Sequence, residues 1–371
     1  MKKKLVVHLA ETPLAGAPIR IVNALNLYTN YEARLINFNP QCYGSRTYPE
    51  DINWQNENQA GEAMRLINDA DIFHVHHPIK VNSIHNVFKL KFTEVNPNAK
   101  FLFQFGSNKN HFDKDKIEYI DNMHFGKSVI IHCAERDYMG YSNLPNIINC
   151  YDKILSPLDT SNELPVVFYS PSSPYGVAEK RWNSKGKPEV LKMLRKIQRK
   201  VDFEICLVES VPYEECMELK RKSDIVIDDI TTGSFHLTSL EGLSMGKPTV
   251  SYLDSRTVSV LTSFTGSRDL PFVNVRIKEL APVLIELLND PSLRRAVGGY
   301  SRRWIEEYYS PEINVRHYEK LYERILHGDQ NTLADDDFEA KDFLYRKVND
   351  CIWEEYFKED IIKHRILKKI F

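Results

Sequence analysis

The segment from residue 223 to residue 254, SDIVIDDITTGSFHLTSLEGLSMGKPTVSYLD, constrains the fold more than any other part of the chain. Its β-branched run at residues 225–227 predicts a short buried strand. Apolar residues then recur at helical spacing over residues 237–244, and the Gly-Lys-Pro sequence at residues 246–248 ends that helix. Residues 249–253 predict another strand. A strand, a helix and a strand in this order form a unit of a parallel α/β sheet.

Glu241 is the unusual residue of the predicted helix. It lies four positions after Leu237 and next to Leu240, so it shares the stripe that faces the sheet. A carboxylate there needs partners, because an unpaired buried charge is very costly. The residues alone leave two interpretations open. Glu241 bonds a neighbouring loop at the edge of the helix, or it binds ligand hydroxyl groups at the carboxyl edge of the sheet, where open α/β folds bind ligands.

The residues from Gly233 to Glu241, followed by the Met-Gly-Lys-Pro sequence at residues 245–248, resemble the donor-site signature of retaining GT-B glycosyltransferases of family four. In that family an E-x7-E pattern runs into a Gly-Lys-Pro turn, and its second glutamate binds the ribose hydroxyl groups of the donor. Glu241 matches this second glutamate. Gly233 takes the place of the first, which contacts the donor sugar in the family.

The loop at residues 171–188, PSSPYGVAEKRWNSKGKP, is rich in lysine and arginine and follows a predicted strand at residues 166–170. Exposed lysines are common, so the loop has a simple explanation as a solvated surface. Opposite a helix N-terminus, it would instead clamp a diphosphate with cations and backbone N–H groups. The family's P-x-S/T…K-G pattern implies that Lys185 is the phosphate lysine and that Arg181 is its partner. We expect these two as the catalytic residues.

The same resemblance implies the other donor-binding residues. Ser234, Leu237 and Thr238 lie where the amides of the predicted helix would face the diphosphate. Ser210 and Val211 begin a loop that would border the nucleotide base. In the mechanism implied, the cations and amides stabilise the departing nucleoside diphosphate as its negative charge develops.

Gly16 lies between a predicted strand at residues 4–11 and a predicted helix at residues 18–28. A glycine before a helix that begins with proline suits a tight turn, which by itself is the simpler interpretation. The loop is also similar to the family's glycine-rich N-terminal loop, which lies over the donor phosphates. This implies that Gly16 binds the donor. Arg20 faces the cleft or the solvent.

Three histidines, at positions 74, 76 and 77, end a predicted strand that begins at Ile72. Alternate residues of a strand face opposite sides, and no carboxylate lies close in sequence, so this pattern does not predict a metal site. The D-I-x-H-x-H strand end resembles the family's acceptor side and implies that His76 and His77 bind the acceptor. Gly106 takes the place of the histidine that closes the next strand in many relatives. His111 follows on a loop and is either a replacement on the acceptor side or a surface histidine.

Composition bounds the remaining classes. The 371 residues suffice for two α/β domains with cores, and a net charge of −2 gives no reason to expect nucleic acid as a partner. The six cysteines lack metal-ligand or CxxC spacing and predict reduced thiols. No stretch approaches the length of a membrane span, and the apolar run after the N-terminal lysines is too short for a signal peptide. We therefore expect a cytoplasmic protein.

The resemblance implies a GT-B architecture of two Rossmann-like α/β domains that face each other across a cleft. Residues 1–160 would form the acceptor domain and residues 161–310 the nucleotide-sugar donor domain. A helix at residues 311–328 would cross back to the first domain, and residues 329–371 would form a helical tail. The implied reaction transfers a sugar, with retention of configuration, from a nucleotide-sugar to a saccharide or lipid-linked saccharide. No metal or other cofactor is expected.

Two other functions stay open. Gly233 and Gly106 favour a catalytically inactive GT-B-like subunit that binds or stabilises a glycosyltransferase, whereas Glu241, Lys185 and the Gly-Lys-Pro turn favour an enzyme. A sugar-nucleotide epimerase on the same fold would need paired carboxylates in the cleft, and the sequence reveals no such pair.

The tail ends in IIKHRILKKIF, in which isoleucines alternate with basic residues at helical spacing. The simpler interpretation is a helix that packs back on a domain. The basic amphipathic pattern also suits an anionic membrane surface, so peripheral contact with the inner face of the membrane is a second expectation.

Overall fold

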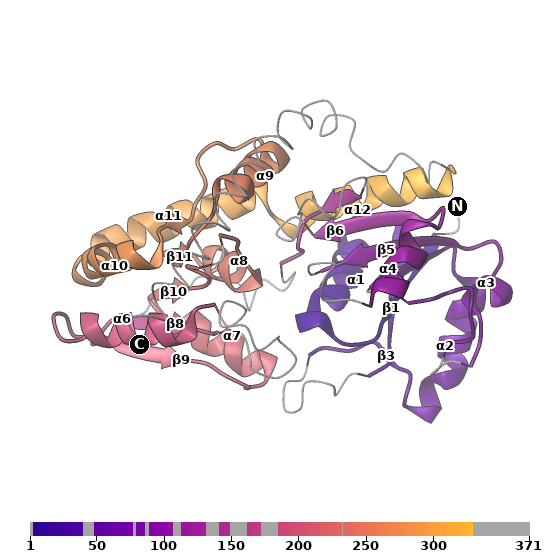
Figure 1. Cartoon of the computed structure of the whole chain (residues 1–371), viewed down its shortest axis with the longest axis horizontal. Helices are drawn as coiled ribbons and strands as arrows, with labels where there is room; N and C mark the ends of the chain where they lie inside the picture. Colours follow the sequence, from indigo (N-terminus) through magenta and orange to yellow (C-terminus); the bar gives the residue numbers. More distant parts are fainter. Residues whose placement is uncertain are drawn as a thin grey trace.

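The computed structural model describes residues 3–39, 48–76, 79–85, 89–106, 113–130, 141–148, 162–171, 185–231 and 233–328. Two parallel sheets, each flanked by helices, form two domains that lie side by side (Figure 1). The helix α12 (Pro311–Leu326) leaves the second domain and lies along the first.

Within the described residues the first sheet has seven strands in the order β3-β2-β1-β4-β5-β6-β7, and every recorded pairing is parallel. The strands are β1 (Lys4–Ala10), β2 (Tyr31–Asn37), β3 (Ile52–Asn53), β4 (Ile72–His76), β5 (Lys100–Phe105), β6 (Gly126–Ile130) and β7 (Ser142–Leu144). Its helical segments are η1 (Leu14–Gly16), α1 (Ala17–Tyr28), α2 (Glu57–Asp69), α3 (Phe92–Val95) and α4 (Lys114–Asp121).

The second sheet has five strands among the described residues, in the order β12-β11-β10-β8-β9, again all parallel. They are β8 (Val166–Tyr169), β9 (Glu204–Leu207), β10 (Ile225–Ile227), β11 (Thr249–Ser251) and β12 (Val273–Asn274). The helical segments are α6 (Lys187–Ile197), α7 (Tyr213–Lys222), α8 (Leu237–Ser244), α9 (Ser255–Thr265), η6 (Ile277–Glu279), α10 (Leu280–Asn289) and α11 (Pro291–Tyr308).

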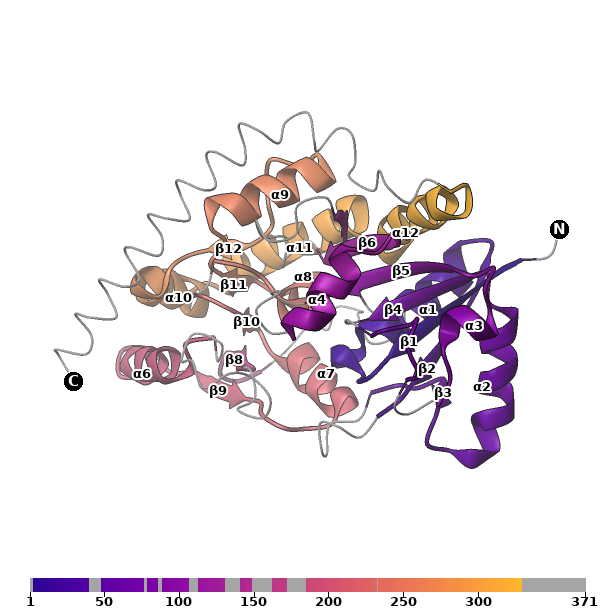
Figure 2. The same ribbon diagram turned by 45° about the vertical axis from the view of Figure 1, so that its right-hand side comes forward.

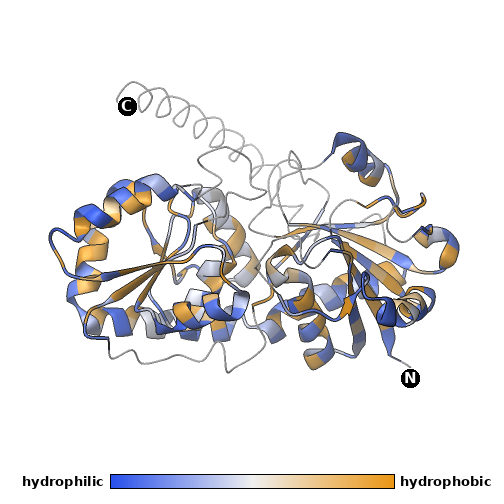
Figure 3. Cartoon of the chain, turned by 90° about the horizontal axis from the view of Figure 1, so that it is seen from below, coloured by the Kyte–Doolittle hydropathy of each residue, from blue (hydrophilic) through white to orange (hydrophobic). Residues whose placement is uncertain are grey.

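Alternation along the strands builds a core on both faces of the first sheet. Leu5, Val7 and Leu9 of β1 belong to one buried cluster, whereas Val6 and Ala10 belong to the cluster on the opposite face. Neither face is solvated, which is why the strands read as continuous apolar runs. Figure 3 shows the same pattern in both domains, with apolar strands inside and helices that turn polar faces outward.

The helix α12 completes the first domain from the far end of the chain (Figure 2). It packs against α1 and β5. Its buried face joins the cluster that contains Val6 and Ala10, through Val315, Tyr318, Leu321, Tyr322 and Ile325. The first domain is therefore closed by a segment that follows the second domain in sequence.

Two glycines allow close packing around α8. A Cβ atom on Gly242 would lie 2.6 Å from the Thr249 side chain, so α8 lies tightly against the sheet. A Cβ on Gly298 of α11 would lie 2.0 Å from the carbonyl oxygen of Gly246. The turn after α8 thus sits directly against α11, and only glycine fits at this contact.

Some elements differ from the sequence-based expectation. The sequence predicts a helix at residues 61–69, whereas the observed helix α2 begins at Glu57, because the Asn56 side chain accepts the backbone N–H of Asn58 at 3.1 Å and caps the helix there. The sequence does not predict α9, whose residues SRTVSVLTSFT are poor helix formers. The Asp254 cap and the burial of Val260 and Leu261 stabilise it instead. The short strands β3, β7 and β12 carry too few residues for a period to be recognised.

None of the helices in the described ranges combines the length and the apolar character that a membrane span requires.

Candidate functional site

The Lys185-Gly186 turn lies beyond the carboxyl end of β8 and leads into α6. Both residues have left-handed backbone conformations, with φ of 55° and 65°. A Cβ on Gly186 would lie 2.5 Å from the Thr231 side chain, so glycine is required there. The Tyr169 hydroxyl at the end of β8 donates to the Lys185 carbonyl at 3.0 Å. The turn is therefore held against both the strand and the neighbouring loop.

Asp228 is the first residue after β10, and its carboxylate accepts hydrogen bonds from the surrounding polar groups. The Lys185 ammonium donates to Oδ1 at 2.6 Å. The backbone N–H of His236 and the hydroxyl of Ser239, at the start of α8, donate to Oδ2 at 2.8 and 2.6 Å. The His236 ring nitrogen Nδ1 lies 3.6 Å from Oδ1. One buried carboxylate thus joins the lysine turn to the N-terminus of α8.

The charges around Asp228 keep it ionised. Burial alone would raise the pKa of this carboxyl, since its side chain is 0% exposed. The Lys185 ammonium is the largest influence that opposes burial, and together with the neighbouring His236 it holds the pKa of Asp228 well below its ordinary value. Lys185 and Asp228 therefore form a buried ion pair. The Lys185 ammonium, which is expected to bind a phosphate, is therefore already paired with the Asp228 carboxylate inside the protein.

Glu241 is also buried and paired. It lies on α8 at 3% exposure, and its Oε2 accepts a short hydrogen bond from the Lys220 ammonium of α7. Burial by itself would lower the pKa of Lys220, but the Glu241 carboxylate outweighs this and raises it. The Lys220 ammonium also lies 5.1 Å from the centre of the Phe168 ring. The other oxygen of Glu241, Oε1, has no hydrogen-bond partner among the described residues.

Gly233 has a left-handed conformation with φ of 87°. A Cβ at this position would lie 2.9 Å from the Cβ of Asp254, so no larger side chain fits without movement. Asp254 donates its backbone N–H to the Gly233 carbonyl at 2.9 Å and caps α9. Ser234, Leu237 and Thr238 are half-buried residues at or just before the start of α8. They therefore lie beside the Asp228 cluster.

The loop after β9 carries Ser210 and Val211. Ser210 has a left-handed backbone with φ of 56°, and Val211 packs against a small buried cluster. Just before them, the Glu209 carboxylate accepts two hydrogen bonds from the Lys187 ammonium, each 2.7 Å long. The Tyr213 ring lies 5.7 Å from the Tyr48 ring of the first domain. This edge of the second domain therefore meets the first.

Gly16 lies on the first domain near the same junction. Leu14, Ala15 and Gly16 all have positive φ, and a Cβ on Gly16 would lie 3.2 Å from the Tyr48 ring. Arg20 fixes the loop, since its guanidinium donates to the carbonyl oxygens of Ala15 and Ile147 at 2.9 and 3.1 Å. Strained backbone of this kind persists where the surroundings hold it in place.

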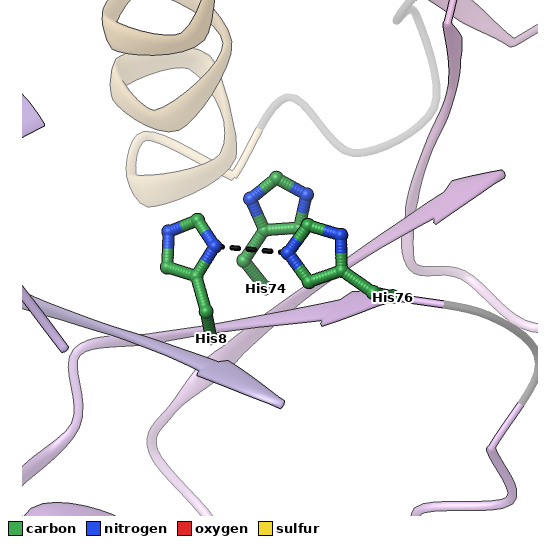
Figure 4. Close-up of side chains that lie close together, drawn as sticks. All are labelled: His8, His74 and His76. Carbon is green, nitrogen blue, oxygen red and sulfur yellow. Dashed lines mark hydrogen bonds between the residues drawn. The ribbon is translucent and has the colours of Figure 1, made fainter. Parts of the chain in front are cut away.

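His76 belongs to a buried cluster with His8 and His74 between the sheet and α12 (Figure 4). His8 Nδ1 lies 2.9 Å from His76 Nε2, and His74 Nδ1 lies 2.7 Å from the Tyr322 hydroxyl. Burial is the main cause that lowers the pKa of His8 and of His74 well below the ordinary value, so both rings are neutral. The 3% exposure of His76 removes its side chain from contact with bulk solvent.

The same three histidines each offer a nitrogen within 4.8 Å of the others, as a metal site would. The rings of His74 and His76 are stacked, however, with an interplanar angle of 15°. Imidazole lone pairs lie in the ring plane, so the two lone pairs run in nearly parallel planes and do not converge on one point. The cluster is arranged as a hydrogen-bonded stack, which the sequence does not predict because His8 lies 68 residues from His76.

Several expected site residues lie outside the described residues. These are Arg181 of the basic loop, His77 and His111 on the acceptor side, and the C-terminal tail.

Solved structures share the arrangement of the two domains. A glycosyltransferase from Rickettsia africae matches with a TM-score of 0.58 at 16% identity, over 88% of this chain and 99% of that one. Sucrose-phosphate synthase from Thermosynechococcus elongatus matches with a TM-score of 0.52 at 11% identity, over 88% and 100%. Anabaena HepE, solved in complex with UDP and glucose, matches with a TM-score of 0.52 at 13% identity, over 86% and 100%. The fold is GT-B.

The GT-B fold confirms the predicted architecture of two Rossmann-like domains. No protein-family model matches the sequence, and no curated protein matches it. Within this GT-B chain the expected donor residues lie on adjoining segments of the second domain. Lys185 bonds to Asp228, and Ser234, Leu237 and Thr238 lie close in sequence to His236 and Ser239, which also bond to Asp228. Glu241 lies one turn further along α8.

The sequence does not predict Asp228, Lys220 or His236 as partners of the expected donor-binding residues. The signal for Asp228 was present, because an acidic residue directly after a buried strand lies at the edge where ligands bind in parallel sheets. Lys220 gives no such signal, since it lies in a run of lysine and arginine that reads as a solvated helix end.

Proposed function

We propose that this protein transfers a sugar from a nucleotide-sugar to a saccharide or lipid-linked saccharide, with retention of configuration. The observation that carries the proposal is the cluster at the ends of β8 and β10. A lysine turn, the N-terminus of α8 and a buried carboxylate meet there within hydrogen-bond distance. Phosphate groups are bound by such cations and helix N-termini. The GT-B fold and the UDP held by the similar Anabaena HepE are consistent with it.

In this proposal Lys185 and Arg181 are the catalytic residues, and they stabilise the departing diphosphate electrostatically. Glu241, Ser234, Leu237, Thr238 and Gly16 bind the donor, and Ser210 and Val211 border its base. His76, His77 and His111 belong to the acceptor side. No protein nucleophile is required, because the leaving phosphate accepts the proton of the acceptor. No metal or other cofactor is required, because basic residues and a helix N-terminus take the place of a metal.

A second function is favoured by specific contacts. Lys185 and Glu241 both have internal partners, Asp228 and Lys220, and Gly233 leaves no room for a longer side chain beside Asp254. A GT-B subunit without turnover, which binds or stabilises a glycosyltransferase, would tolerate such internal pairing. The two functions differ in whether a nucleotide binds and whether it turns over.

A thermal-shift panel of UDP, GDP, ADP and their common nucleotide-sugars tests the proposal. A ligand at about a hundred times its Kd adds about 2.7 kcal/mol to the free energy of unfolding, which is easily measured. A positive hit is then assayed for sugar transfer with native chain and with Lys185→Ala. We expect Lys185→Ala to lower kcat more than it raises donor KM, because the charge matters most in the transition state. A chain that no nucleotide stabilises would contradict the transferase and support the subunit.

A further inference from the structure

The geometry around Asp228 points to a residue that binds the donor and is not part of the expected set. We propose that His236 binds the donor diphosphate as an imidazolium, and that Asp228 is the positioning residue that holds both His236 and Lys185. This inference rests on the proposed function and deepens it, since it concerns the same site.

His236 lies at the N-terminus of α8, beside Asp228. It caps α8, its backbone N–H donates to Asp228, and its ring nitrogen Nδ1 lies 3.6 Å from the same carboxylate. The side chain is 37% exposed, whereas those of Asp228 and Lys185 are 0% and 8% exposed. Of the three side chains, the imidazole is therefore the one that a ligand at the end of β10 can reach most readily.

The net charge of the cluster of Asp228, Lys185 and His236 depends on whether the imidazole is protonated. Among the described residues, the Asp228 carboxylate at the end of β10 lies 3.6 Å from the His236 ring, and the Lys185 ammonium, from the turn before α6, donates to the same carboxylate. Lys185 and Asp228 cancel each other. With a neutral imidazole the cluster carries no net charge, and a diphosphate with two or more negative charges gains little from it. With a protonated imidazole the cluster carries a charge of +1, and this charge lies on the most exposed of its three side chains.

The affinity for a diphosphate then depends on pH. Histidine is the side chain whose charge ordinarily changes between pH 5 and 8. A diphosphate that binds the charged form draws a proton onto His236, and Asp228 holds the imidazolium in place. Binding is therefore coupled to the uptake of a proton, and it strengthens as the pH falls from 8.5 to 6.5.

Calorimetric titration of UDP, GDP and ADP into the native chain tests this directly. Each titration is repeated at pH 7 in two buffers of different ionisation enthalpy, which gives the number of protons taken up. We expect clear uptake for the native chain and markedly less for His236→Gln. At pH 6.5 His236→Gln should bind about tenfold more weakly, which corresponds to about 1.4 kcal/mol, and the gap should narrow at pH 8.5.

Two further variants make the test specific. His124→Gln changes an exposed histidine of the first domain and should behave as the native chain. Asp228→Asn keeps an oxygen acceptor for the His236 backbone N–H and the Ser239 hydroxyl but removes the negative charge, so it should also lower the proton uptake. Its folding is checked separately by thermal unfolding. A merely structural Asp228 would lower the melting temperature and leave the proton count unchanged.

The outcomes separate this inference from the proposed function. If UDP, GDP and ADP all fail to bind the native chain, the proposed function falls and the inference with it. If one of them binds, and His236→Gln has native affinity and native proton uptake, the inference alone is overturned. The diphosphate's own titration is common to all variants and cancels in the comparison.

Discussion

The second domain contains two buried lysines, and each forms an ion pair with a buried carboxylate. Lys185 and Lys220 each face one carboxylate, Asp228 and Glu241, and all four side chains are at most 8% exposed. In such surroundings a pair is held together strongly, yet the desolvation of both charges offsets much of the gain. Removal of one partner is more damaging than removal of both, because it leaves an uncompensated buried charge.

We predict that Glu241→Leu alone lowers the free energy of unfolding by about 3–5 kcal/mol, since it leaves Lys220 unpaired at 1% exposure. The double variant Lys220→Met with Glu241→Leu should recover most of this loss. Chemical denaturation of the two single variants and the double variant gives the coupling energy. A single variant of native stability would show that the pair contributes nothing.

The double variant also separates the two roles of Glu241. Because it is expected to fold, its affinity for UDP reports on donor binding without a stability defect. If Glu241 binds ribose hydroxyl groups, the stable double variant loses nucleotide affinity. Native affinity in that variant would make Glu241 a structural residue and remove the strongest match to the glycosyltransferase signature.

At the scale of elements, α8 is positioned by contacts that only small residues permit. The carbonyl of Gly246 approaches Gly298 of α11 so closely that a Cβ would stand at 2.0 Å. The next residue, Gly299, would place a Cβ only 3.5 Å from the flexible end of Arg303. Two adjacent glycines of one helix thus have opposite environments.

We predict that Gly298→Ala destabilises the protein by about 1–3 kcal/mol, because α11 or the turn after α8 must move. Gly299→Ala is the matched control and should stabilise by up to about 1 kcal/mol through helix propensity. Thermal unfolding of both variants measures the difference. Equal effects at the two positions would show that the contact between α11 and the turn is not close in solution.

The seam between α12 and the first sheet, where Tyr318 and Tyr322 meet His74 and Gln104, contains hydrogen bonds as well as apolar packing. Tyr322 meets His74, and the Tyr318 hydroxyl donates to the Pro145 carbonyl at 2.7 Å and accepts from Gln104 at 3.1 Å. His8 completes the stack beneath the helix. The seam therefore depends on imidazole rings that are buried in their neutral form.

We predict that the buried histidines of this seam make the folded protein less stable in acid. The folded-state pKa values of His8 and His74 lie below the unfolded value of about 6.5, so unfolding takes up protons as the pH falls below that value. Their contribution to stability is fully present above about pH 6.5 and is lost below it, by about 1.4 kcal/mol per pH unit for each proton bound.

Denaturation between pH 7.5 and 5 measures this slope. The double variant His8→Gln with His74→Gln should be less stable at pH 7.5 but have a flatter profile, whereas His124→Gln should keep the native slope. A native slope in the double variant would assign the acid sensitivity to other groups.

At the scale of the whole molecule, the chain is tied together across the domain junction. The helix α12 closes the first domain after the second has been completed, and Ile148 joins a buried cluster of the second domain. Tyr48 and Tyr213 meet from opposite sides. The loops at Gly16 and Ser210, which are expected to contact the donor, thus lie near the place where the two domains meet.

We predict that deletion of residues 360–371 abolishes a weak, salt-sensitive attachment to anionic vesicles without weakening UDP binding. The deleted segment carries four basic residues, each of which is worth about 1 kcal/mol near an anionic surface. Sedimentation with anionic and neutral vesicles at low and high salt measures it. Full-length protein that stays in the supernatant at low salt would leave the tail with a structural role and remove the support for a lipid-linked acceptor.

From local patterns alone, the chain is predicted to alternate parallel strands and helices, and α8 is predicted to end just before Gly246. These features follow from local periodicity and from backbone conformations that only certain residues adopt readily. The match between residues 233 and 248 and the glycosyltransferase signature also needed no tertiary information, and the fold agrees with it.

Which charged groups meet depends on the tertiary structure. Lys185 pairs with a carboxylate 43 residues away, Lys220 with one 21 residues away, and His74 with a tyrosine 248 residues away. No spacing rule reaches such pairs, because each depends on how separate strands and helices stack. A lysine in a basic loop or a basic helix end reads as solvated in sequence. Its burial, and the carboxylate that makes the burial tolerable, arise only when the sheet brings both to the same edge.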